Sequence, residues 1–201
     1  MTTVCAFRYG NEIAIAADRR VSFGNEMTTD SIQSSKIIPF EGAYLGISGS
    51  SRIINIFEND SELRESDLTS MNAIFNSYNM FSDVFEDKYH FDLKDENNGV
   101  FHDIGFNSIV INSNGIFSIN HGCEINLHET LWSVGTGSEY CIGAMTLFSR
   151  TFENLNKNET ASSICKASIK ISATYDPFTG CLLYTSPSPR DRTRSRMPSS
   201  A

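Results

Sequence analysis

The sequence predicts an α+β protein with four layers, in which two antiparallel sheets stack face to face and helices cover both outer sides, an αββα sandwich. Two observations lead to this prediction. Strand-like segments joined by tight turns occur in two groups, and a pair of helix-like segments follows each group. The chain of 201 residues, 40% of them hydrophobic, is long enough for one sizeable core. We therefore expect one domain over residues 1–180.

The first half contains two predicted hairpins and two predicted helices. Apolar residues 4–7 and 13–17 flank a turn at residues 9–12, and residues 36–48 form a second hairpin that turns at Glu41 and Gly42. Residues 50–62 and 69–90 then change to a helical period. One face of the longer segment is apolar at the spacing i, i+4, i+7, i+11, which predicts a stripe facing the core: Ile74, Tyr78, Phe81 and Phe85.

The second half repeats this order. Residues 106–111 and 115–120 alternate around Asn114 and Gly115, a strong hairpin signal. Helices are predicted at about 138–155 and 159–174, with a break at residues 154–158. The polar residues 92–98 are expected to form a loop.

Thr2 is the first candidate for chemistry. If Met1 is removed, Thr2 carries a hydroxyl nucleophile and a free amine, and an amine with an ordinary pKa of roughly 8 can accept the hydroxyl proton. Such pairing activates a threonine without a histidine. A nearby ammonium group would help the hydroxyl to lose its proton, and a carboxylate would hold that ammonium, so Lys36 and Asp18 are candidates. Singly, each residue also has an ordinary explanation: a strand start, a turn cap and a solvated lysine.

A series of short segments resembles the proteasome β-subunits and the HslV peptidase, and the resemblance covers residues 2–180. It implies an N-terminal-nucleophile (Ntn) hydrolase with an αββα sandwich. Five further segments follow Thr2-Thr3-Val4 in the order of that family: AADRRV at 16–21, KI at 36–37, LGISG at 45–49, VGTGS at 134–138 and DPFTG at 176–180.

The resemblance also implies roles for individual residues. Thr2 would be the nucleophile, Asp18 and Lys36 its activating pair, and the backbone N–H of Gly46 the donor to the oxyanion. Gly46 has an equally ordinary explanation as a glycine beside a strand bend. A hydroxyl, a carboxylate and a second hydroxyl would surround the terminal amine: Thr136, Asp176 and Thr179.

Two features depart from the family pattern. The family commonly has serine where Thr136 and Thr179 stand, and threonine keeps the hydroxyl. Lys36 comes slightly later than usual, which implies a short insertion within residues 26–35.

The implied activity is that of a threonine-type endopeptidase. It would hydrolyse peptide bonds in unfolded proteins through an ester on Thr2. The resemblance further implies a homo-oligomeric ring and an ATPase as a possible activator. Two alternatives remain open at this point: a related amidase acting on a small-molecule amide, and a catalytically silent ring subunit.

Composition argues against several other classes. The acidic balance disfavours binding to a nucleic-acid backbone, and there is no apolar run of about 18 residues and no leader, so we expect a cytoplasmic protein that binds neither nucleic acid nor membrane. The cysteines and histidines lack ligand spacing, so we expect reduced thiols and neither metal nor cofactor. The glycines at 135 and 137 could cradle an anion, but no dinucleotide-binding pattern surrounds them.

Residues 181–201 differ abruptly in composition from the rest. Residues 181–191 back-translate to DNA that resembles a transposon-end sequencing adaptor, so we expect a non-native, disordered tail; a natural basic tail that binds nucleic acid or membrane is the alternative. Without these residues the chain has 12 basic and 23 acidic residues, a net charge of −11. The family has a further strand after the position of Gly180, so we expect the last strand of the fold to be missing from this chain.

Overall fold

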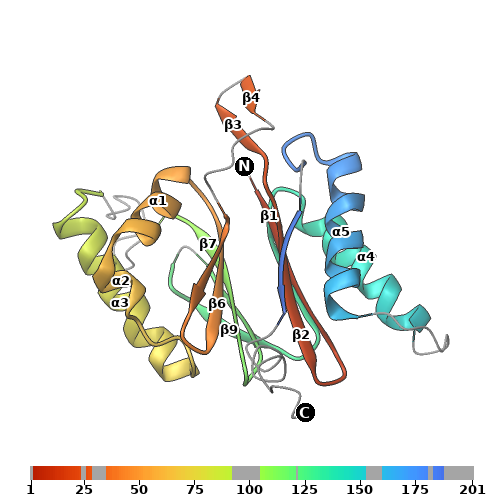
Figure 1. Cartoon of the computed structure of the whole chain (residues 1–201), viewed down its shortest axis with the longest axis horizontal. Helices are drawn as coiled ribbons and strands as arrows, with labels where there is room; N and C mark the ends of the chain where they lie inside the picture. The colour runs from red at the N-terminus through yellow and green to blue at the C-terminus, as the bar shows by residue number, and fades with distance from the viewer. Residues whose placement is uncertain are drawn as a thin grey trace, which may run out of the picture.

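Two antiparallel β-sheets lie face to face in the computed structural model, and helices cover the outer side of each sheet (Figure 1). The α+β fold with four layers is therefore confirmed. The structure describes residues 2–23, 26–28, 35–91, 105–120, 122–152, 160–180 and 183–187.

One sheet has four strands in the order β10-β1-β2-β11, and the other has five in the order β5-β6-β7-β8-β9. The strands of the first sheet are β1 (Thr3–Tyr9), β2 (Glu12–Asp18), β10 (Leu131–Gly135) and β11 (Leu183–Pro187). The strands of the second are β5 (Ile37–Phe40), β6 (Ala43–Ser48), β7 (Asn107–Asn112), β8 (Ile116–Ile119) and β9 (Ile125–His128). A separate short hairpin follows β2: β3 (Val21–Phe23) and β4 (Glu26–Thr28).

The helices form the two outer layers. Figure 1 shows the first three beside the five-stranded sheet and the last two beside the four-stranded sheet. The first layer comprises α1 (Ser51–Asn59), α2 (Ser61–Arg64) and α3 (Met71–Asp87). The second comprises α4 (Ser138–Phe152) and α5 (Ala161–Tyr175).

The four-stranded sheet is buried on both faces, and β1 shows how the sequence achieves this. Side chains alternate between the faces of a strand. Val4 and Ala6 therefore pack between the two sheets, whereas Cys5 and Phe7 pack against α4 and α5. The third core region lies between the five-stranded sheet and α1–α3, and it contains the predicted stripe of α3. All four residues of that stripe are buried, as predicted.

Several details differ from the sequence predictions. The strand β9 was not predicted, and its first residue, Ile125, is only partly buried. The strand β11 lies at Leu183–Pro187 and pairs with β2, so neither a missing last strand nor disorder of these five residues is confirmed. The predicted loop at residues 92–98 and the predicted break at 154–158 lie outside the described residues. Among the helices of the described ranges, none combines the length and the hydropathy needed to cross a membrane.

Asp60 links the outer helices. It caps α2 by accepting the N–H groups of Glu62 at 3.0 Å and Leu63 at 3.3 Å, and its other oxygen accepts from Lys88 Nζ and Tyr89 Oη, each at 2.7 Å. Burial by itself raises the pKa of the Asp60 carboxyl, but these hydrogen bonds outweigh it and lower the pKa to about 2. The ionised carboxylate is therefore the form that the fold stabilises.

This shift predicts a pH-dependent stability. A carboxyl group whose pKa falls on folding stabilises the fold above its unfolded value of 3.8, and this stabilisation is lost as pH falls through about 2. Replacement by Asn keeps the cap and removes the charge. We expect Asp60→Asn to lower the free energy of unfolding by about 1–2 kcal/mol at pH 6 and by almost nothing near pH 2. Urea denaturation at both pH values checks this, and a difference that does not change with pH would contradict it.

Candidate active site

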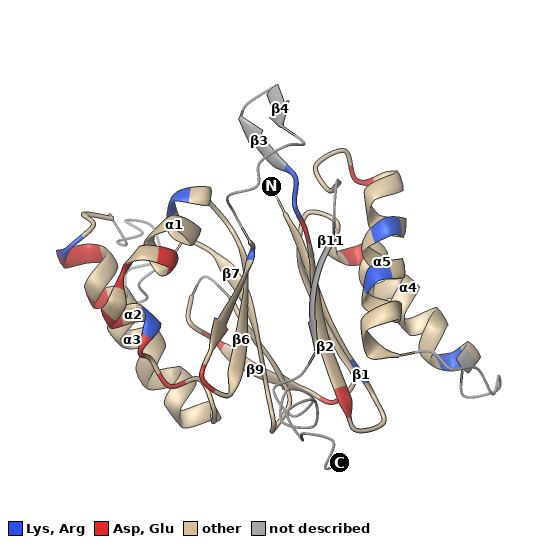
Figure 2. Cartoon of the chain, viewed as in Figure 1, with Lys and Arg blue, Asp and Glu red and all other residues tan. Residues whose placement is uncertain are grey.

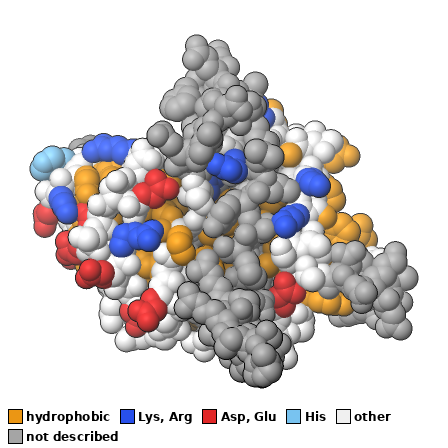
Figure 3. Space-filling model, in the orientation of Figure 1, with side chains coloured by type: hydrophobic (Ala, Val, Ile, Leu, Met, Phe, Trp, Pro, Cys, Tyr) orange, Lys and Arg blue, Asp and Glu red, His pale blue; other side chains and the backbone are white. Residues whose placement is uncertain are grey.

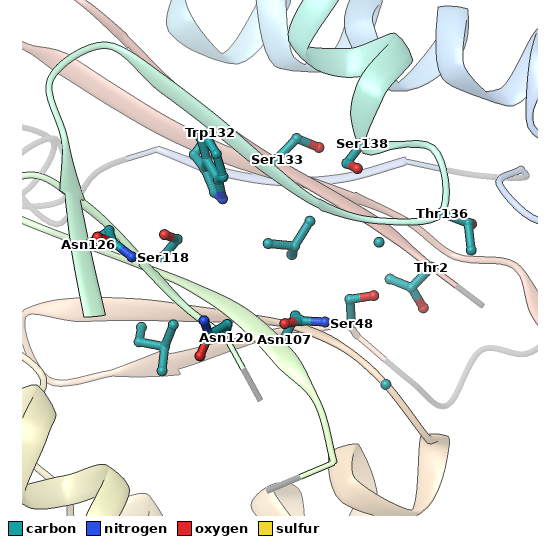
Figure 4. A pocket seen from close by; sticks show the side chains of 14 residues that line it. Thr2, Ser48, Asn107, Ser118, Asn120, Asn126, Trp132, Ser133, Thr136 and Ser138 are labelled. Carbon is teal, nitrogen blue, oxygen red and sulfur yellow. The ribbon is translucent and has the colours of Figure 1, made fainter. Parts of the chain in front are cut away.

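Thr2 lies immediately before β1, at one end of a pocket of about 670 Å³. It is buried, and its carbonyl oxygen accepts the N–H of Thr136 at 3.1 Å. Figure 4 shows both threonines at the same end of the pocket. This hydrogen bond therefore ties the backbone before β1 to the turn that follows β10.

Asp18 ends β2 and is completely buried. Its Oδ1 accepts the N–H of Thr3 at 2.9 Å and Lys36 Nζ at 2.8 Å. Its Oδ2 accepts the N–H groups of Arg20 at 3.2 Å and Gly180 at 3.1 Å. One carboxylate thus joins the first strand, the end of the second strand, the lysine and the segment after α5.

Lys36 lies immediately before β5, on the opposite sheet from Asp18. Its ammonium group also donates to the carbonyl oxygen of Arg20 at 2.7 Å, and its side chain is only 3% exposed. A buried charge is tolerated only when it is paired and hydrogen-bonded, and both conditions hold here. The structure therefore brings the predicted pair Asp18 and Lys36 together beside Thr3, the residue next to the predicted nucleophile.

A second carboxylate, Asp176, holds the other predicted residues together. Its Oδ2 accepts the hydroxyls of Thr136 at 2.6 Å and Thr179 at 2.5 Å, and its Oδ1 accepts the N–H of Phe178 at 3.0 Å. Burial raises the pKa of this carboxyl, but the hydrogen bonds and the positive charge of Arg20 outweigh it, so the pKa lies below its ordinary value. The predicted trio of Thr136, Asp176 and Thr179 is therefore one hydrogen-bonded group.

The end of α5 explains this placement. Asp176 is the C-cap, and its own N–H donates to the carbonyl oxygen of Ser172 at 2.8 Å. Pro177 follows, and a residue before proline is disfavoured in helical conformation. Asp176 accordingly adopts extended angles, with φ −90° and ψ 114°. The chain turns here and brings Thr179 and Gly180 back to the start of β1.

Thr3 is a site residue that the sequence reasoning missed. It is fully buried, and its hydroxyl accepts the N–H of Gly137 at 3.0 Å and lies 2.5 Å from the hydroxyl of Thr179. Its backbone is held by Asp18, as described above. A second threonine at the start of a strand gives no signal of this role, because its partners are more than 130 residues away in sequence.

Gly135 and Gly137 are needed because the chain passes too close for a side chain. A Cβ at Gly135 would lie 1.8 Å from the carbonyl oxygen of Thr2, and Gly135 has a φ of +99°. A Cβ at Gly137 would lie 1.9 Å from Ser172 Oγ and 2.6 Å from Thr3 Oγ1. The sequence suggested that Gly135 and Gly137 could bind an anion. In the structure they instead leave space for Thr2 and Thr3.

Gly46 requires a correction. It lies inside β6 between Ile37 of β5 and Ile109 of β7, so its N–H belongs to the sheet, and it does not line the pocket. A Cβ there would lie 2.6 Å from Val4 and 2.8 Å from Ile15, so this glycine lets the two sheets approach. Gly49 follows the last paired residue of β6 and does line the pocket with Thr2.

Most of the residues that line the pocket have hydroxyl or carboxamide side chains. Its lining residues come from the start of β1, the end of β6, β7 to β10 and the start of α4: Thr2, Ser48, Gly49, Asn107, Ser118, Ile119, Asn120, Asn126, Trp132, Ser133, Val134, Gly135, Thr136 and Ser138. The described part of the chain contains no group of three or more His, Cys, Asp or Glu side chains that could hold a metal ion.

Solved structures share this fold. BPH from Thiobacillus denitrificans, in complex with epoxomicin, matches with a TM-score of 0.80 and 22% sequence identity over 92% of this chain and 97% of that chain. Another BPH structure matches with a TM-score of 0.78, 22% identity and the same coverage. Eukaryotic HslV from Trypanosoma brucei matches with a TM-score of 0.66 and 16% identity over 92% of this chain and 98% of that one. The sequence itself matches no protein-family model and no curated protein.

These matches confirm, at the level of the fold, the resemblance expected from the sequence. The chain therefore shares the fold of BPH and of HslV.

The contact between Gly135 and Thr2 leads to a prediction for two alanine variants. Gly135→Ala forces a clash with Thr2 and a strained φ, so we expect it to lower the free energy of unfolding by roughly 2–5 kcal/mol. Gly143 lies in the exposed part of α4, where a Cβ meets nothing within 4 Å. Gly143→Ala is the matched control and should raise stability by up to about 1 kcal/mol. Equal stability of the two variants in urea would contradict the proposed contact.

Proposed function

We propose that this protein is a threonine-type peptidase that hydrolyses peptide bonds through an ester on Thr2 after Met1 has been removed. The observation that carries the proposal is the buried ion pair beside the first strand. Oδ1 of Asp18 holds both the ammonium group of Lys36 and the N–H of Thr3. The positive charge and the backbone N–H that follows the candidate nucleophile are thereby held by one oxygen atom. Thr2 itself lies at one end of a pocket that can admit substrate.

The first half of the reaction forms the ester. The amine of Thr2 takes the hydroxyl proton while the oxygen attacks the substrate carbonyl, and the Lys36 ammonium favours the ionised oxygen. The tetrahedral intermediate then collapses, the C–N bond breaks, and the proton passes from the amine to the departing peptide. The product is an ester between Thr2 and the acyl half of the substrate.

An oxyanion needs a fixed N–H donor near the nucleophile, and Gly49 fits this role better than Gly46. It lines the same pocket as Thr2 and lies beyond the last strand pair of β6. A Cβ at Gly49 would come within 2.7 Å of Phe106, so the backbone is packed firmly against its neighbour. A fixed donor of this kind contributes about 2.7–4 kcal/mol to lowering the barrier.

The second half of the reaction hydrolyses the ester. The Thr2 amine takes a proton from water as the hydroxide attacks, and it returns that proton to the hydroxyl when the acid product leaves. The Asp176 group assists by position: its hydroxyl partner Thr136 lines the pocket, and Thr136 N–H holds the Thr2 carbonyl. The carboxylate does not itself need to exchange protons.

The natural substrate in this proposal is unfolded protein, and the assembly is a homo-oligomeric ring opened by an ATPase. Support for self-association comes from apolar side chains exposed on the outer helix pair (Figure 3). Four large ones lie on α4 and α5: Tyr140, Leu147, Ile171 and Tyr175. Tyr140 and Tyr175 stack with ring centroids 5.7 Å apart, which joins the two helices in one apolar surface.

The proposal predicts the mass and the activity of the purified protein. Intact-mass measurement should show that Met1 is absent. Thr2→Ala should lower cleavage of an unfolded protein such as casein at least ~1,000-fold because no nucleophile remains. Thr2→Ser keeps a hydroxyl and an amine, and should retain measurable cleavage.

Other outcomes would point elsewhere. Retained Met1 in a stable ring would favour a catalytically silent subunit. Thr2-dependent hydrolysis of small amides alone, without peptide cleavage, would favour an amidase. Unchanged peptide cleavage by Thr2→Ala would refute the proposed nucleophile.

A further inference from the structure

The pocket extends well beyond Thr2, and its far end forms a separate part that we name the distal subsite: Ser118, Asn120, Asn126 and Trp132. Figure 4 shows Ser118, Asn126 and Trp132 at the end opposite Thr2. On β10, Gly135 pairs with Thr3 and Trp132 pairs with Ala6. Three residues of a strand span about 10 Å, the length of about three residues of an extended peptide.

The described lining residues of the whole pocket include no Lys, Arg, Asp or Glu. Their polar groups are amides and hydroxyls, together with the indole of Trp132, whose ring nitrogen points into the pocket in Figure 4. Many of the charged residues belong to the outer helices (Figure 2).

The distal subsite is held in one geometry. The ring of Trp132 stacks on His128 with a centroid distance of 4.1 Å and an interplanar angle of 12°, and His128 Nε2 lies 2.7 Å from Ser118 Oγ. Asn120 is fixed by donating to Glu124 at 2.9 Å and accepting from the N–H of Gly122 at 3.1 Å. Burial lowers the pKa of His128, so its ring stays neutral near pH 7.5.

We propose that the distal subsite selects a neutral, hydrogen-bonding side chain of the substrate, of the carboxamide type found in Gln and Asn, about three residues from the scissile bond. A carboxamide offers a donor and an acceptor, which match the amide of Asn126 and the indole N–H of Trp132. A carboxylate or an ammonium finds no opposite charge among the described lining residues, and the neighbouring Glu124 carboxylate already accepts a hydrogen bond from Asn120. An alkyl chain leaves the amide and indole groups unpaired. The inference rests on the proposed function for its substrate, a peptide.

Binding at this subsite can be measured without catalysis. Trp132 is the only tryptophan of the chain, so its fluorescence reports directly on the distal subsite. Capped alanine hexapeptides with one Gln at successive positions are titrated into Thr2→Ala protein at about pH 7.5, alongside matched peptides with Glu, Lys or Leu. We expect a Gln peptide in one register to change the emission with a Kd at least ~10-fold below those of the matched peptides. Equal or tighter binding of the Leu peptide would overturn the inference.

A charge-switch variant provides the second test. Asn126→Asp places a carboxylate in the distal subsite, so the Lys peptide should bind at least ~10-fold more tightly than the Gln peptide. Asn79→Asp, on the exposed face of α3, makes the same change elsewhere and should leave the preference for Gln intact. An unchanged ranking in Asn126→Asp would refute the role of this subsite.

The two proposals fail in different ways. Selective binding of the Gln peptide without any Thr2-dependent cleavage would leave the subsite standing and remove the peptidase. Thr2-dependent cleavage without side-chain preference and without a change in Trp132 emission would support the peptidase and remove the distal subsite. Absence of any emission change on peptide addition overturns the distal subsite, whatever the cleavage result.

Discussion

The buried carboxylate of Asp18 is the interaction on which the rest of the site depends. It accepts four hydrogen bonds, from the backbone of Thr3, Arg20 and Gly180 and from the ammonium of Lys36. A carboxylate without exposure to water needs such partners, because an unpaired buried charge is very costly. These hydrogen bonds fix the start of β1, the position of the Lys36 ammonium group from the opposite sheet, and the return of the chain after α5. The proposed activation of Thr2 relies on the same geometry that stabilises the fold.

Close backbone packing is the second constraint. Gly46 lets the sheets approach where Val4 and Ile15 meet β6, and Gly135 lets the turn after β10 touch the carbonyl of Thr2. The pocket lies beside the apolar cluster between the sheets and shares Trp132 and Val134 with it. Thus small residues determine how near the layers come, and polar residues determine what the remaining space can bind.

Much of the fold could be predicted from the sequence, because turn residues and apolar periodicity are local signals. The stripe of α3 and the hairpin at Asn114 are examples. By contrast, β9 is only four residues long, so the alternation of Ile125 and Leu127 with polar residues is too short a signal to identify a strand. Asp18 and Lys36 could be found because they lie in short motifs. Thr3 could not, since its role arises only from long-range contacts. Gly46 was assigned the wrong role because a glycine that admits a neighbouring sheet and one that offers its N–H to a ligand look alike until strand register is known.

The most direct test of the central claim is the rate at which Thr2 itself is acylated. A β-lactone transfers its acyl group to an activated hydroxyl, and intact mass with peptide mapping locates the ester without requiring the natural substrate. The matched variants are Lys36→Met and Lys88→Met, because each removes the lysine of a Lys–Asp ion pair: Lys36 is buried with Asp18, and Lys88 is half exposed beside Asp60. The account predicts that Lys36→Met slows acylation of Thr2 at least ~100-fold while Lys88→Met, although less stable, reacts at the rate of the unaltered protein. Equal acylation rates in the two variants, with both folded, would contradict it.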